Sequence, residues 1–184
     1  MLKKLLIASA LTIVASNMVI AAPAPYVGAG LGIVNNSPNK TSFNNFRGVP
    51  VNLFTGYGGM VNQNIYLAGE LGATIATGEL SNTGNSLKTN YGYSASIIPG
   101  IMVSDYTLAF VKAGVVRSHF SSFHKTVTGG QVGIGLQTSL TQNVDLRGEY
   151  DFTAYRSIKN THFSSSGTTP RSDAFNLALI YKFE

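Results

Sequence analysis

Charged side chains at alternate positions are the most informative chemical feature of this sequence. Arg147, Glu149 and Asp151 stand at every second position, so a β-strand would place all three on one face. Glu70 and Lys112 occupy the inner face of two other alternating segments. Removing one partner of a buried ion pair typically costs ~3–5 kcal/mol, so enclosed charges are expected to pair. We therefore predict that Glu70 and Arg147 form a central ion pair, with Lys112, Glu149 and Asp151 completing the network.

Signals for metal or cofactor chemistry are weak. The chain contains no cysteine, which excludes disulfides and a cysteine-based zinc site. His119, His124 and His162 lack the close spacing that a metal site needs, so we predict neither a metal nor a cofactor. Glycines at 28, 30 and 32 alternate with apolar residues and no helix follows, which does not fit a dinucleotide fingerprint. We expect such glycines to face inward and to make room for bulky side chains on neighbouring strands.

One pair of residues offers an alternative in nucleophilic catalysis. His119 and Ser121 would place an imidazole and a hydroxyl on one face near the outer end of a strand. This arrangement resembles the His-x-Ser motif of lipid A deacylases of the PagL type, which are also eight-stranded barrels. A nucleophilic serine needs a base that a carboxylate orients, and no carboxylate follows until Asp145. We therefore predict that the protein is not an enzyme.

Eight segments of alternating character must position these side chains. Each is near the ~9–11 residues that a tilted strand needs to cross a bilayer. In the last segment Phe175, Leu177, Leu179, Tyr181 and Phe183 share one face. The segments span residues 26–34, 51–60, 65–76, 90–101, 106–117, 130–140, 144–155 and 175–183. We expect Pro99 to lie at the end of regular pairing or at a bulge, because proline cannot donate to a ladder.

The connections between these segments alternate between short and long. Short ones lie at 61–64, 103–105 and 141–143, whereas long ones rich in Ser, Asn, Thr and Gly span 35–50, 77–89, 118–129 and 156–172. This is the outer-membrane pattern. The face opposite the apolar one carries too many charges for one side of a soluble sheet. We predict an all-β fold: an eight-stranded antiparallel up-and-down transmembrane β-barrel with short periplasmic turns and four longer external loops.

The N-terminus has the layout of a secretory signal peptide. Two lysines precede an apolar run at 5–14, and small residues follow. Pro23 disfavours cleavage immediately before it, so we place the cut after Ala21. An uncleaved anchor is the alternative, although a polar residue interrupts the apolar run. The predicted organisation is a signal peptide at 1–21 and a barrel domain at 22–184.

The mature sequence resembles the small eight-stranded outer-membrane barrels, especially the OmpA transmembrane domain. Four motifs carry the resemblance: AGELG around Glu70, FVKAG around Lys112, GLQTSLTQ at the end of the sixth segment and LRGEYDF in the seventh. The aromatic last strand is similar to the signal that such barrels present to the barrel assembly machinery, although here Glu184 follows Phe183. The resemblance implies location in the bacterial outer membrane.

The resemblance also implies a plugged lumen. In the OmpA family a Glu and an Arg at the positions of Glu70 and Arg147 close the lumen. An alternative pairing with a Lys and a second Glu is associated with opening, and the matching positions here hold Ser96 and Gln137. We therefore predict a closed plug. By alternation, a cation should be poorly tolerated at Leu179, Val111 or Ile134 on the lipid face and tolerated better at Ser96 or Gln137 on the lumen face.

We predict that the protein is a non-catalytic, monomeric outer-membrane barrel that supports the envelope and displays surface loops. An adhesin that binds a host or matrix surface is the first alternative. A narrow ion channel is less favoured, because eight strands leave a lumen just filled by side chains.

Basic residues dominate the predicted long loops and their flanks. Against two acids, Glu79 and Asp173, stand eight cations: Lys40, Arg47, Lys88, Arg117, Lys125, Arg156, Lys159 and Arg171. Lysine and arginine supply charge-assisted hydrogen bonds to phosphate. We predict that this basic rim contacts lipopolysaccharide in the outer membrane, and we expect no nucleic-acid partner.

Overall fold

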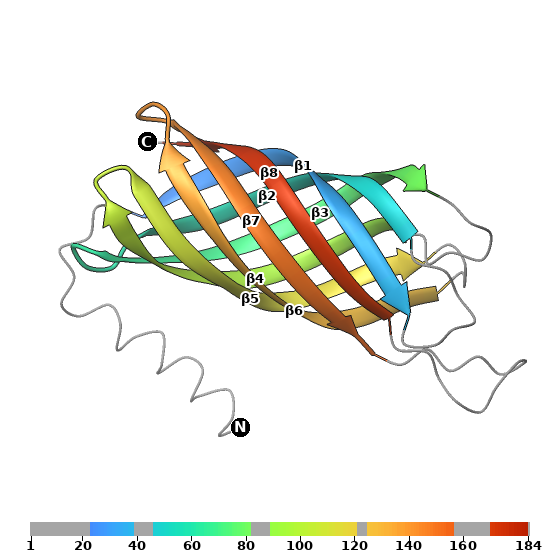
Figure 1. The fold of residues 1–184 in the computed structure, drawn as a ribbon. Helices are drawn as coiled ribbons and strands as arrows, with labels where there is room; N and C mark the ends of the chain where they lie inside the picture. Colours follow the sequence, from blue (N-terminus) through green and yellow to red (C-terminus); the bar gives the residue numbers. More distant parts are fainter. Residues whose placement is uncertain (1–22, 39–45, 82–88, 121–124, 157–169, 184) are drawn as a thin grey trace, which may run out of the picture.

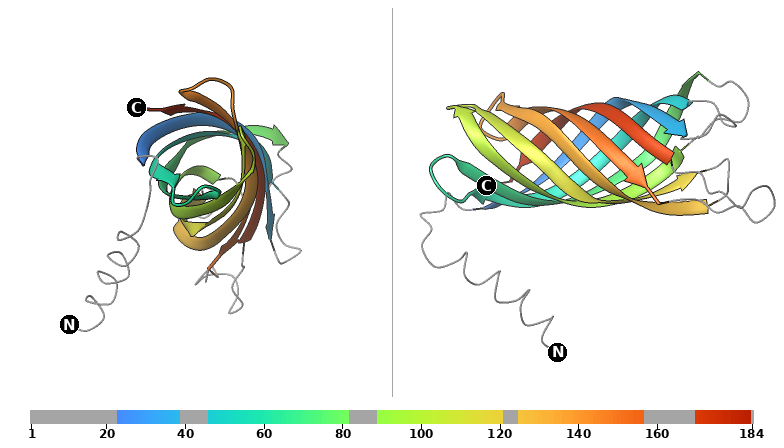
Figure 2. Two further views of the ribbon diagram at one scale, coloured as in Figure 1. Left: turned by 90° about the vertical axis from the view of Figure 1, so that its left-hand side faces the viewer. Right: turned by 60° about the horizontal axis from the view of Figure 1, so that its bottom comes forward.

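Eight antiparallel strands close into one barrel, as predicted from the sequence. The computed structural model describes residues 23–38, 46–81, 89–120, 125–156 and 170–183, so the predicted signal peptide lies outside the described residues. Each strand pairs with the next and the last pairs with the first (Figures 1 and 2). The strands are β1 (Ala24–Pro38), β2 (Phe46–Met60), β3 (Ile65–Ser81), β4 (Thr89–Ser104), β5 (Thr107–Phe120), β6 (Lys125–Ser139), β7 (Val144–Tyr155) and β8 (Pro170–Lys182). None of the described residues belongs to a helix long and apolar enough to cross a membrane.

The three short connections lie at the same end of the barrel as the C-terminus (Figure 1). Backbone hydrogen bonds close two of them tightly: the Val61 amide donates to Ile65 over 2.7 Å, and the Leu140 amide donates to Val144 over 2.9 Å. β1, β3, β5 and β7 end, and β2, β4, β6 and β8 begin, at the opposite end of the barrel (Figure 1). We refer to the end with the short turns as the turn end, and to the other as the loop end.

Most strands are longer than the alternation predicts. β2 begins at Phe46 rather than at 51, and β3 ends at Ser81 rather than at 76. The predicted long connections are correspondingly shorter, and only β7 has the predicted bounds. Backbone pairing needs no apolar side chains, so the ladders continue past the apolar band through polar and glycine residues.

Pro99 does not end the pairing of its strand. It pairs with Leu67 of β3 inside β4. On the other side, the ladder to β5 passes from Ile97 directly to Gly100 without a register shift. The missing donor is therefore accommodated by a local gap toward β5, not by the strand end or bulge that we predicted.

The barrel is apolar outside and polar inside. Exposed large hydrophobic residues occupy the predicted outward positions of all eight strands, such as Leu71, Val111, Ile134 and Leu179, and a few others lie at or near the turns, such as Val103. Buried polar residues, by contrast, lie on the opposite face, such as Asn176. This inverted arrangement is that of a barrel that spans a membrane.

The register determines which inward residues share a level. Each strand residue is paired with one on the next strand, so a path of paired residues can be followed once round the barrel. A path that starts at Tyr26 of β1 returns to β1 ten residues further along, at Asn36. The path is Tyr26, Gly56, Glu70, Ser96, Gly114, Gln131, Thr153, Ser172 and Asn36. Strands are therefore strongly tilted, as eight-stranded barrels require. β3 and β7, four strands apart, face each other across the lumen.

Candidate functional site: the ion-pair network in the lumen

Arg147 of β7 and Glu70 of β3 meet at the centre of the lumen. The Arg147 Nη1 donates to Glu70 Oε2 over 2.6 Å. The two residues are only 1% and 5% exposed. The Tyr26 hydroxyl of β1 donates to the same carboxylate oxygen over 3.0 Å. The contact is therefore a short, charge-assisted hydrogen bond between two desolvated ions.

Gln137 of β6 binds the remaining edge of the guanidinium. Its Oε1 accepts from Arg147 Nε over 3.0 Å and from Nη2 over 2.9 Å. Gln137 Nε2 in turn donates to Asp145 Oδ2 over 2.7 Å. Three of the donor groups of Arg147 are thus engaged by two side chains, which holds the planar fork in one orientation.

Three aromatic rings enclose the same guanidinium. The Arg147 Cζ lies 5.0 Å from the centroid of Phe54, 5.1 Å from that of Phe110 and 5.7 Å from that of Tyr26. These distances permit cation–π attraction, which is stronger at desolvated sites. The rings also fill the lumen around the ion and exclude water from it.

Each of these rings lies over an inward glycine on a neighbouring strand. A Cβ at Gly28 would collide with the Phe54 ring, a Cβ at Gly56 with the Tyr26 ring, and a Cβ at Gly135 with the Phe110 ring; the pairs are Gly28–Phe54, Gly56–Tyr26 and Gly135–Phe110. The prediction that inward glycines make room for bulky neighbours is confirmed at these positions.

Lys112 of β5 links Glu70 to two further carboxylates. Its Nζ lies 2.8 Å from Glu149 Oε1, 3.5 Å from Glu70 Oε1 and 3.9 Å from Asp151 Oδ2. Lys112 and Arg147 therefore contact three carboxyl groups, those of Glu70, Glu149 and Asp151. Each ion is close to an opposite charge, which offsets much of the cost of burial.

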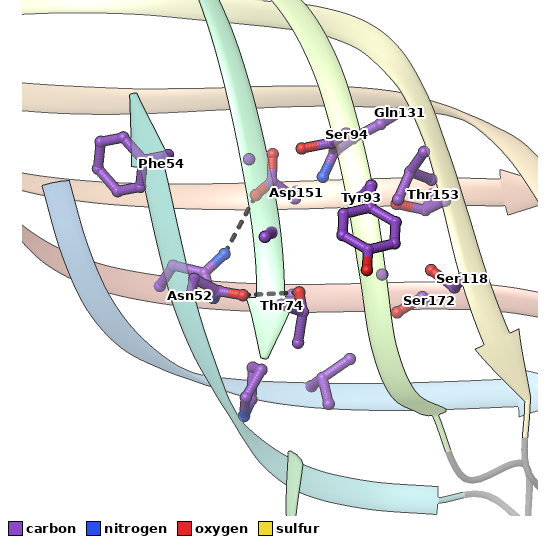
Figure 3. Close-up of a pocket in the computed structure, with 18 of the residues that line it drawn as sticks. Asn52, Phe54, Thr74, Tyr93, Ser94, Ser118, Gln131, Asp151, Thr153 and Ser172 are labelled. Atoms are coloured by element: carbon purple, nitrogen blue, oxygen red, sulfur yellow. Dashed lines mark hydrogen bonds between the residues drawn. The ribbon is translucent and has the colours of Figure 1, made fainter. Parts of the chain in front are cut away.

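A polar cavity of about 120 Å³ lies on the loop-end side of the network (Figure 3). The Asn176 Nδ2 donates to Asp151 Oδ2 over 3.1 Å, and Asn176 Oδ1 accepts from Asn52 over 3.0 Å. Asn52 Oδ1 accepts from the Thr74 hydroxyl over 2.8 Å, as Figure 3 shows. Hydroxyl and amide groups thus continue the network from Asp151 outward.

A second cavity, of about 290 Å³, lies on the turn-end side. Gln137, Asp145 and Lys182 contribute to its lining, together with apolar side chains. Lys182 Nζ lies 2.9 Å from Asp145 Oδ1. Arg147 lines neither cavity. The guanidinium and its aromatic enclosure therefore separate the two cavities, and an ion crossing the lumen would have to displace them.

The five network residues predicted from the sequence all lie in this cluster, and the structure adds partners that sequence reasoning missed. Tyr26 was not assigned a role, and Gln137 was considered only as the replacement of an acid on the lumen face, not as a partner of Arg147. Asp145 and Lys182 form an ion pair outside the predicted network. What the alternation could not indicate was the level of each residue along the barrel, which depends on the register.

The predicted basic rim divides into described and undescribed residues. Arg47, Arg117 and Arg171 lie exposed on strands at the loop end, and exposed Arg156 directly follows β7. Lys125 begins β6, where its side chain is not described. The other three predicted rim residues, Lys40, Lys88 and Lys159, lie outside the described residues.

The described part of the structure provides no support for a catalytic pair of His119 and Ser121. The His119 ring stacks on Tyr91 with centroids 4.9 Å apart, and its Nδ1 lies 3.3 Å from the Thr126 hydroxyl. Ser121 lies outside the described residues. Among those that are described, no group of three or more His, Cys, Asp or Glu side chains could hold a metal ion.

Solved structures share the architecture of this barrel. Neisserial surface protein A superposes with a TM-score of 0.61 at 18% identity, covering 86% of this chain and 97% of that protein. Ail, the attachment invasion locus protein of Yersinia pestis, superposes with a TM-score of 0.53 at 16% identity, covering 88% of this chain and 99% of that protein. At these identities the likeness concerns the fold. No curated protein sequence is similar enough to count as a relative.

The sequence itself matches a family that is described as the outer membrane protein beta-barrel domain, over residues 5–183. The match covers nearly the whole chain, and it agrees with the closed barrel, its apolar outer face and its charged lumen. The chain therefore belongs to this family of bacterial outer-membrane barrels.

Proposed function

We propose that the protein is a non-catalytic structural barrel of the outer membrane that presents its loop end outside and keeps its lumen closed. The observation that carries the proposal is the enclosure of Arg147. The guanidinium has hydrogen bonds to Glu70 and Gln137 and is surrounded by three rings. To open a path, several of these contacts must break together while the ion stays desolvated. Breaking a buried pair is strongly unfavourable, typically by ~3–5 kcal/mol.

Lys112 bears on how firmly the lumen is closed. In this sequence Ser96 and Gln137 replace the cation and the acid that are associated with opening in the OmpA family. Lys112, however, approaches Glu70 to 3.5 Å from β5 while Arg147 is still bound. Both cations thus hold the same carboxylate at once, which supports a closed network.

Planar-bilayer recording tests the closed lumen. The wild-type barrel should be nearly silent, whereas Arg147→Ala, which removes both the ion and its volume, should produce frequent current steps. Arg117→Ala is the matched control, because this arginine is exposed on the outer face. Frequent large openings in the wild type would contradict the proposal.

Adhesion to a host or matrix surface is the second candidate function. Its support is the exposed loop end with its arginines, and the fold shared with an attachment protein adds no more than architecture. A deletion strain scored for detergent sensitivity and for cell adhesion separates the two candidates. Detergent sensitivity with normal adhesion supports the envelope role, whereas lost adhesion with an intact envelope supports the alternative.

A further inference from the structure

Aromatic, cationic and hydroxyl side chains form a row across four neighbouring strands at the loop end. Tyr93 of β4 is paired with Arg117 of β5, and Arg117 is paired with Thr128 of β6. The Arg156 amide donates to the Thr128 carbonyl oxygen over 3.0 Å, which extends the row to the end of β7. All four residues are exposed. Tyr93, Arg117, Thr128 and Arg156 are referred to below as the outer row.

A second set of side chains adjoins the outer row two residues further toward the loop end. Tyr91 is paired with His119, and His119 with Thr126. The rings of Tyr91 and His119 are stacked with an interplanar angle of 7°. Tyr91 also contacts Tyr93 edge to face, with centroids 6.3 Å apart. The outer row therefore borders a surface of flat rings.

The two guanidiniums of the outer row are available to a ligand. Neither Arg117 nor Arg156 has an ion pair or a side-chain hydrogen bond with another residue in the described part of the chain. Their backbones are two strand spacings apart, roughly 10 Å. Two arginines at this spacing can each bind a phosphate group of one ligand, since guanidinium and phosphate form bidentate, charge-assisted hydrogen bonds.

The outer surface directly below the arginines lacks a side chain at one position, Gly130. Gly130 of β6 pairs with Val115 and Ala154, and all three are exposed. A Cβ added at Gly130 would meet nothing within 4 Å. The next outward residue along β6, Val132, belongs to the exposed apolar band. Alkyl chains that descend from a bound headgroup would therefore meet an apolar surface that is unobstructed at Gly130.

We propose that the outer row binds the phosphorylated saccharide headgroup of a glycolipid in the surrounding outer leaflet. Arg117 and Arg156 hold phosphate groups, the Tyr93 ring lies against a sugar face, and an acyl chain lies along the open apolar surface at Gly130. The position of the row at the upper edge of the apolar band favours a lipid of the same membrane over a soluble glycan. The inference rests on the proposed outer-membrane role and extends it by assigning a specific lipid site.

The test compares two double variants with equal loss of charge. Arg117→Gln/Arg156→Gln removes the paired guanidiniums, and Arg47→Gln/Arg171→Gln removes two exposed rim arginines that lie on β2 and β8. Each barrel is refolded in neutral detergent and titrated with fluorescently labelled lipopolysaccharide, either intact or chemically dephosphorylated. Vesicles of phosphatidylglycerol supply negative charge without a saccharide.

The wild type should bind intact lipopolysaccharide at least tenfold more tightly than the dephosphorylated form, a difference that corresponds to about 1.4 kcal/mol. The outer-row variant should lose this preference and the control variant should keep most of it. Tyr93→Leu should weaken binding of lipopolysaccharide but not of phosphatidylglycerol.

Equal losses in the two double variants would overturn the site, because they would indicate a diffuse positive field around the whole rim. Equal affinity for both forms of lipopolysaccharide would overturn it as well, as would tighter binding of a soluble sulfated glycan than of lipopolysaccharide. Gel mobility and bilayer conductance of the same preparations report independently on the closed barrel. The lipid-binding titrations therefore test the lipid site, and gel mobility and conductance test the proposed function separately.

Discussion

Replacing Arg147 with methionine removes the charge at the centre of the lumen but retains much of the side-chain volume. The substitution abolishes the 2.6 Å contact to Glu70 and both hydrogen bonds to Gln137. Glu70 keeps the Tyr26 hydroxyl at 3.0 Å and Lys112 at 3.5 Å, so its carboxylate is not left without partners. The loss should therefore fall at the lower end of the ~3–5 kcal/mol that is typical of a broken buried pair.

Gln137 adds a smaller contribution. Its Oε1 loses both donors, and an unsatisfied buried acceptor costs about 1–3 kcal/mol. The three aromatic rings around position 147 remain in place, so we expect little rearrangement of the surrounding side chains. Since these effects share one network and are not additive, we expect a total loss of about 4 kcal/mol in the free energy of unfolding.

Urea unfolding in lipid vesicles, followed by the gel mobility of the folded barrel, measures this loss. Glu70→Gln and the double variant Glu70→Gln/Arg147→Met complete a double-mutant cycle. The double variant should cost less than the sum of the two single variants by at least about 1 kcal/mol, since both single changes remove the same Glu70–Arg147 contact and the double change removes it only once. Arg171→Met is the control on the exposed face and should stay within about 0.5 kcal/mol of the wild type.

Two results would refute the reasoning. A loss below about 1 kcal/mol for Arg147→Met would mean that the guanidinium is no more important than a surface ion. Strict additivity of the cycle would mean that Glu70 and Arg147 stabilise the barrel independently, despite the short distance between them.

Three further perturbations test other parts of the structure. Ile134 is 63% exposed on the lipid face, so Ile134→Arg should lower the free energy of unfolding in bilayers by ~2–4 kcal/mol. Gln131 lies beside the loop-end cavity, and Gln131→Arg should lower it clearly less in the same vesicle assay. Gly56→Val should displace the Tyr26 ring that lies over this glycine and cost about 1–3 kcal/mol of stability. At Gly69 an added Cβ meets nothing within 4 Å, so Gly69→Ala should be near neutral. Equal costs would contradict the idea that inward glycines make room for rings. The Lys182 side chain is 33% exposed, so Lys182→Gln should cost less than about 1 kcal/mol of stability, and salt should reduce this effect. A loss as large as that of Arg147→Met would be inconsistent with the exposed position of Lys182.

Alternation alone was enough to predict the inside and outside of this barrel. A side-chain period of two assigns every strand residue to one face, so the apolar positions and the inward charges follow without a structure. Glu70 and Arg147 were predicted to meet because both face inward in a narrow lumen, and the structure brings them to 2.6 Å. Strand ends were poorly predicted, because paired backbone continues where the apolar pattern stops.

The tertiary structure decided which inward residues share a level. Gln137 illustrates the difference: its inward, polar character suggested that it would tolerate an arginine, and this prediction is inconsistent with the two hydrogen bonds that its Oε1 accepts from Arg147. The rows at the loop end depend on register in the same way, since Arg117 and Arg156 are far apart in sequence and share only Thr128 as a neighbour. A period of two specifies a face but carries no information on the offset between strands. That offset comes from the closure of eight tilted strands into one barrel, which no single segment encodes.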